Sequence, residues 1–100
     1  PPGLPFPYDT GIIKVRTVNN LISKIKNDGP VGTYLVVVRE HVLVIHKVDD
    51  GGLYIVNTEG KFQSKSIVRQ LVYIERKPSD PLFKWISSKP EKAKEIVKKI

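Results

Sequence analysis

Three short apolar runs between residues 33 and 58 constrain the fold of this chain more than any other feature. They lie at residues 34–38, 42–45 and 53–56 and are rich in β-branched side chains, which favour a pleated, partly buried strand. The polar stretch 39–41 separates the first two runs. The Asp-Asp-Gly-Gly stretch at 49–52 separates the next two, and its glycines can supply the positive φ of a tight turn. We therefore predict a three-stranded antiparallel meander.

An amphipathic helix is predicted immediately before the meander. Val18, Leu21, Ile22 and Ile25 recur at the spacing of one helical face. Thr17 can cap the first turn, and the Asn-Asp-Gly-Pro stretch at 27–30 carries stop signals in the expected order. Residues 12–16 form a short run that suits a strand, and residues 1–10 hold four prolines, which favour an extended arm.

Residues after the meander alternate between strand and helix signals. The β-rich run 71–74 predicts a fourth strand, preceded by one helical turn at 66–70. Asp80 followed by Pro81 suits the start of a short helix that ends near Ile86. A capping box at Ser88 and Glu91 then predicts an amphipathic terminal helix, with its apolar face at residues 93, 96, 97 and 100.

These elements predict an α+β fold: an antiparallel sheet of four to five strands, one N-terminal helix, and one or two C-terminal helices. One hundred residues suffice for a single domain with one modest core. We predict a Pro-rich arm at 1–10, the first helix and the sheet within 11–77, and the C-terminal helices within 80–100.

Composition excludes some chemistry and favours some partners. The sequence has no Cys, which excludes disulfides, thiolate metal sites and thiol nucleophiles, and we expect no cofactor. No apolar run approaches the roughly 20 residues of a transmembrane helix, and the N-terminal residues do not resemble a signal peptide. The net charge of +7 favours acidic partners, nucleic acid first among them. Size and charge together would suit a viral or phage protein in the cytoplasm or the virion.

Lysines crowd the C-terminal segment. In the predicted terminal helix they would form an outward basic stripe able to neutralise phosphates, or simply a solvated face. The candidate nucleic-acid-binding residues are Lys89, Lys92, Lys94, Lys98 and Lys99.

His41 is the leading candidate for catalytic chemistry. It opens an apolar strand after a polar break, a position from which a histidine can reach solvent and act as a general base. Asn57 ends the next strand, and its carbonyl could orient the imidazole if the two strands pair with a bulge. His46 falls on the opposite face of the strand from His41, so we expect no metal site between the histidines.

Residues 17 to 60 resemble the histidine-bearing half of papain-like cysteine peptidases, most closely the C39-type bacteriocin-processing peptidases. The resemblance rests on a helix leading to a Gly-Pro step at 29–30, His41 opening a strand, an Asp/Gly turn, and Asn57 after the following strand. It implies that His41 is the base and Asn57 its orienting partner. The chain has Asn57-Thr58 where the family has Asp-Pro, and it lacks the nucleophilic Cys and its helix. The resemblance therefore implies a half-fold with a binding cleft and without peptidase activity.

We expect a non-catalytic protein that engages a protein partner through its Pro-rich arm and terminal helix. Two alternatives remain open on the sequence alone. One is a nucleic-acid-binding protein that uses the C-terminal lysines. The other is a hydrolase that uses Ser or Thr, or that is completed by a Cys-bearing segment on another chain.

Overall fold

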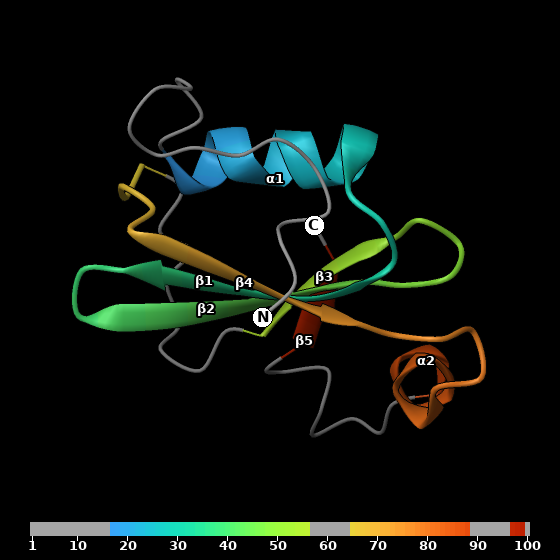
Figure 1. The fold of residues 1–100 in the computed structure, drawn as a ribbon. Coiled ribbons are helices and arrows are strands. Elements are labelled where there is room, and N and C mark those ends of the chain that lie inside the picture. The colour runs from blue at the N-terminus through green and yellow to red at the C-terminus, as the bar shows by residue number, and fades with distance from the viewer. Residues whose placement is uncertain (1–16, 57–64, 89–96, 100) are drawn as a thin grey trace.

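The computed structural model describes residues 17–56, 65–88 and 97–99, which form one antiparallel sheet and two helices (Figure 1). The strands lie in the order β4-β1-β2-β3-β5 across the sheet. This arrangement confirms the predicted α+β class. The elements in chain order are α1 (Val18–Asp28), β1 (Gly32–Val38), β2 (His41–Lys47), β3 (Leu53–Val56), β4 (Gln70–Glu75), α2 (Pro81–Ser87) and β5 (Val97–Lys99).

Helix α1 lies across one face of the sheet (Figure 1). It carries the predicted apolar stripe. Its four predicted core residues are all buried, the most exposed being Ile22 at 6%. The Thr17 hydroxyl accepts a hydrogen bond from the Asn20 N–H at 3.2 Å, which is the predicted cap. At the other end, the Gly29 N–H donates to the Ile25 carbonyl. Both ends of the helix therefore lie where the sequence predicts them.

The main core fills the space between α1 and the sheet. Alternate residues of β1 and β2 point towards the helix, as the two-residue period of a strand requires. Tyr34 is fully buried and its ring lies 5.0 Å from that of Tyr73. The hydroxyl of Tyr34 donates to Pro30 O and that of Tyr73 to Val31 O, each at 2.6 Å. The strand residues of this core are Tyr34, Val36, Val38, Leu43, Ile45, Leu53, Ile55 and Leu71.

A two-residue turn joins β1 to β2. Val38 pairs with His41, so only Arg39 and Glu40 lie between the strands. Glu40 has φ of 62°, a left-handed conformation that glycine or asparagine adopts more readily than glutamate. The next turn, between β2 and β3, uses Gly51 at φ 86°, as its sequence predicted.

Helix α2 packs on a second, smaller apolar cluster. Asp80 caps the helix by accepting the Leu82 N–H at 2.8 Å, and Pro81 occupies the first turn, as predicted. Phe83 and Ile86 are buried against Val48, beside Tyr54 of β3. Trp85 lies on the same helix and is 41% exposed.

Two predictions were wrong in the described segments. Residues Val97–Lys99 form β5, which pairs antiparallel with β3, and are not part of a terminal helix. The edge of β3 offers backbone hydrogen bonds that the helical spacing of the sequence could not reveal. The helical turn expected at 66–70 is also absent: Ile67 bridges to Thr17, and Gln70 begins β4. The Pro-rich arm, the strand expected at 12–16 and the start of the expected terminal helix lie outside the described residues.

The side chain of Lys47 caps the C-terminal end of α1. Its ammonium group lies 2.9 Å from Ile25 O, 3.2 Å from Lys26 O and 2.6 Å from Gly29 O. The Ile25 carbonyl also accepts the Gly29 N–H, whereas Lys26 O has no helical donor because residue 30 is a proline. All three carbonyls lie at the negative end of the helix dipole.

The stability of variants at position 40 should follow how readily each residue adopts a positive φ. Glu40→Gly relieves the left-handed strain and should raise the free energy of unfolding by about 1 kcal/mol, whereas Glu40→Val should lower it. Urea denaturation would measure both, with Arg39→Gly as the control because Arg39 does not have positive φ. Equal stability of the Gly, Glu and Val forms would contradict the assignment of strain to this position.

Removing the ammonium group of Lys47 should destabilise the chain. Lys47→Met keeps most of the side-chain volume but removes the charged donor that the three carbonyls share, and only Ile25 O keeps another donor, the Gly29 N–H. We therefore expect a loss of about 1.5–3 kcal/mol. Lys26→Met is the matched control, since Lys26 is exposed in the last turn of α1. A similar small loss in both variants would show that the contact to the carbonyls contributes little.

Candidate functional site

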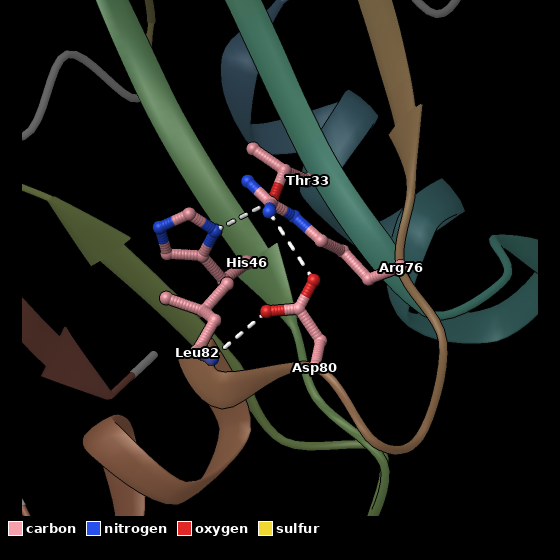
Figure 2. A network of polar contacts seen from close by, with 5 residues as sticks. All are labelled: Thr33, His46, Arg76, Asp80 and Leu82. Carbon is pink, nitrogen blue, oxygen red and sulfur yellow. Dashed lines mark hydrogen bonds and ion pairs between the residues drawn. The ribbon is translucent and has the colours of Figure 1, made fainter.

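A cluster of four polar side chains joins the sheet to the start of α2 (Figure 2). Thr33 on β1 lies opposite His46 on β2, and its Oγ1 is 2.9 Å from the imidazole Nδ1. Arg76, directly after β4, donates through Nε to the same Oγ1 at 2.9 Å. Its Nη1 also reaches Asp80 Oδ2 at 3.3 Å, while Asp80 Oδ1 accepts the Leu82 N–H. Three parts of the chain, β1, β2 and the segment between β4 and α2, thus meet in one network.

The Thr33 hydroxyl links Arg76 to His46. Arginine only donates, so Thr33 Oγ1 accepts from Arg76 Nε. The hydroxyl has one hydrogen and a second acceptor site, so the direction of its bond to His46 Nδ1 follows the tautomer of the ring. In a neutral ring protonated on Nε2, the hydroxyl donates to Nδ1.

The charges around His46 agree with a neutral ring. Burial lowers the pKa of His46, the Arg76 guanidinium lowers it further, and the Asp80 carboxylate opposes the shift. The hydrogen bond from the Leu82 N–H holds the pKa of Asp80 below its usual range, and the Arg76 side chain lowers this pKa further. The network therefore combines a neutral histidine with an ionised carboxylate.

Thr33 and His46 have the contact of a nucleophile and its base, but their burial rules out that role here. Thr33 is only 2% exposed and His46 only 8%, so a substrate cannot approach the hydroxyl. The oxygen also already accepts from Arg76. The network's chemistry is structural: it ties β1, β2 and the segment before α2 together.

A solvent-open cavity of about 510 Å³ lies beside the start of α2. Neither oxygen of Asp80 is free, because one accepts the Leu82 N–H and the other faces Arg76. Asp49 and Lys84 carry opposite charges, so the cavity selects neither anions nor cations. In the described segments no group of three or more acidic, histidine or cysteine residues could hold a metal ion. The cavity is lined by Asp49, Pro78, Ser79, Asp80, Pro81, Phe83 and Lys84.

The candidate catalytic residues of the sequence are not brought together within the described residues. His41 opens β2, as predicted, and lies opposite Val38. The β2–β3 ladder is described from Lys47 and Leu53 as far as Val44 and Val56, and Asn57 lies outside the described residues. The ladder between β1 and β2 has no bulge from His41 to Lys47, so the two histidines do face opposite sides of the sheet.

The basic stripe that was expected along a terminal helix does not extend through the last lysines. Lys98 and Lys99 lie in β5, so a helical stripe through them is wrong. Lys89, Lys92 and Lys94 lie outside the described residues.

The sheet face opposite α1 presents a continuous set of aliphatic side chains. The strand register aligns Val72, Leu35, Val44 and Val56 in one row across four strands. The flanking positions of the same face add Val37, Val42 and Ile74, and we call these seven residues the apolar sheet face. Val42 is 50% exposed, Val72 38% and Ile74 39%. Helix α2 packs near one end of this face, beside Tyr54.

This face was not predicted, although the sequence contains a signal for it. The run 34–38 is apolar at consecutive positions rather than alternate ones, which indicates a strand with apolar side chains on both faces. The polar network had no comparable signal, because its members are separated by up to 47 positions, from Thr33 to Asp80.

Comparison of the chain with protein-family models, with curated proteins and with solved structures finds no match. Among the described residues, neither helix is long and apolar enough to cross a membrane. A function for the chain is therefore inferred from the geometry of its described residues.

The burial of His46 predicts a specific dependence of stability on pH. The pKa of His46 in the folded chain lies below the ordinary value of 6.5, so between the two values the unfolded chain binds more protons. The free energy of unfolding should therefore fall as the pH is lowered through about 6.5, and remain lower once the folded-state pKa is passed.

Two histidine variants separate this effect from other titrations. His46→Gln should be less stable than the wild type at pH 7.5, by about 1 kcal/mol, but should lose less stability between pH 7.5 and 5.5. His41→Gln makes the same chemical change outside the network and is the matched control. Chemical denaturation at each pH measures both, and an unchanged slope in His46→Gln would refute the assignment.

Proposed function

We propose that this chain is a non-catalytic binding module that receives a protein partner on the apolar sheet face. The observation that carries the proposal is the exposure of Val42, Val72 and Ile74 within one contiguous aliphatic surface. Single exposed apolar residues are common on soluble proteins, but a contiguous patch of this kind is typical of an interaction site.

The chemistry of the face defines the partner. The seven side chains of the face are all aliphatic and none carries a charge, so the partner surface should be apolar and of complementary shape at its centre. The chain has a net charge of +7, so acidic residues at the rim of the partner would speed association. We therefore expect a protein with an aliphatic or aromatic patch and an acidic rim.

A binding role also agrees with the chemistry that the chain lacks. The sequence has no Cys, and the threonine beside His46 is buried with its oxygen already engaged. The resemblance to the histidine-bearing half of papain-like peptidases supports the same proposal, since a half-fold without its nucleophile can still bind a polypeptide. His41 and Asn57 would then have no catalytic role.

The test compares partner binding by two matched lysine variants. Val42→Lys places a charge on a half-exposed residue of the apolar sheet face, and Asn19→Lys places the same charge on the exposed side of α1. Proteins retained by the immobilised wild-type chain should be retained by Asn19→Lys and bind Val42→Lys at least about tenfold more weakly. The affinity of each retained protein for the three chains should be measured by calorimetry.

Two outcomes would contradict the proposal. One is that no acidic protein distinguishes wild type from Val42→Lys, although circular dichroism shows both are folded. The other is a partner that binds all three chains equally. Retention that disappears at high salt and is competed by RNA or DNA would instead support the nucleic-acid alternative.

A further inference from the structure

Strand β4 forms an edge of the sheet that could pair with another strand. Within the described segments it pairs only with β1, so its other side presents backbone N–H and C=O groups. Between Gln70 and Glu75 the strand contains neither Pro nor Lys, the residues that commonly protect such an edge. Its side chains Val72 and Ile74 are also substantially exposed.

The sequence of β4 is complementary to itself about Val72. If two copies of the strand pair antiparallel with Val72 opposite Val72, Leu71 lies opposite Tyr73, and Gln70 opposite Ile74. The same register sets Arg69 opposite Glu75 at both ends of the pair. Both residues are exposed, and within the described residues neither has an ion-pair partner. The Arg69 N–H donates to Val37 O at 2.8 Å, which holds this residue at the start of the strand.

Neighbouring registers are less favourable. Centring the pair on Tyr73 sets Arg69 against Lys77 and places the Glu75 carboxylate opposite Leu71. Centring it on Leu71 sets Arg69 opposite Tyr73 and Glu75 opposite Ile67, so the two opposite charges no longer meet. The pairing of opposite charges therefore selects Val72 as the centre.

We propose that the outer edge of β4 binds a second copy of this chain, in an antiparallel pair whose two-fold axis passes through Val72. The pair makes one continuous sheet through both copies. The row of Val72, Leu35, Val44 and Val56 in one copy then continues into the same row of the other copy at Val72. A six-residue strand edge is smaller than the roughly 1,200 Å² of a stable interface, so the dimer forms at high protein concentration. The inference goes beyond the binding function proposed above and stands without it.

A cysteine scan tests the register directly, because the chain has no native Cys. Across the proposed axis, the two Cα atoms of residue 72 are about 4.5–5.5 Å apart, within the range that a disulfide permits. Val72→Cys should therefore form a covalent dimer in a glutathione redox buffer. Ile74→Cys is the matched control, with similar exposure on the same face, but its two copies lie about 13 Å apart.

The expected result is at least tenfold more covalent dimer for Val72→Cys than for Ile74→Cys. Equal yields, or a higher yield for Ile74→Cys, would overturn the proposal. Circular dichroism of the reduced variants checks that both remain folded.

Charge exchange provides an independent test by sedimentation of the chain at 0.05–1 mM. Arg69→Glu and Glu75→Arg each replace two opposite-charge pairs with two like-charge pairs, so each should raise the dimer Kd about tenfold. The double variant R69E/E75R restores both pairs and should recover the wild-type Kd. A chain that stays monomeric throughout this range, or a dimer unaffected by the single variants, would overturn the proposal.

The two proposals fail separately. Val42 lies on β2, away from the β4 edge, so Val42→Lys should leave dimerisation unchanged while weakening partner binding at least about tenfold. Conversely, Arg69→Glu should weaken the dimer without preventing a monomer from binding a partner at Val42.

Discussion

The short connection between β1 and β2 is the constraint on which the rest of the structure depends. Only two residues separate the strands, so the turn sets the register of the central pair, and a slip of one residue would exchange the two faces of the sheet. In the observed register, Tyr34 and Ile45 face α1, while Thr33 and His46 meet on the other side. The strained conformation of Glu40 is thus a local cost offset by the packing of the whole sheet.

Much of the fold could be predicted because its local signals agree with its tertiary structure. The cap and apolar stripe of α1, the three runs of the meander and the Asp-Pro start of α2 all appear where their sequences indicate. The C-terminal segment behaves differently, since the apolar spacing at 93, 96, 97 and 100 fits a helix but Val97–Lys99 pairs with β3. Apolar periodicity measures which side chains are buried, and it contains no information about an unpaired strand edge elsewhere in the chain.

The candidate site was less predictable than the fold. Strand parity correctly separated His41 from His46, but it could not identify Thr33, Arg76 and Asp80 as the neighbours of His46. Those contacts depend on how the segment after β4 turns towards β2, a property of the assembled sheet. General-base chemistry singles out His41 in the sequence, whereas the more distinctive surface is made of ordinary valine, leucine and isoleucine side chains.

The two separate apolar clusters have a consequence for spectroscopy. The chain contains a single tryptophan, Trp85, which lies half-exposed on α2 beside the small cluster rather than in the main core. Its fluorescence will report the detachment of α2, whereas far-ultraviolet circular dichroism will report mainly α1 and the sheet. The two signals need not change together on unfolding, because few contacts hold α2 to the rest. A melting curve recorded through tryptophan emission alone would therefore describe one peripheral helix.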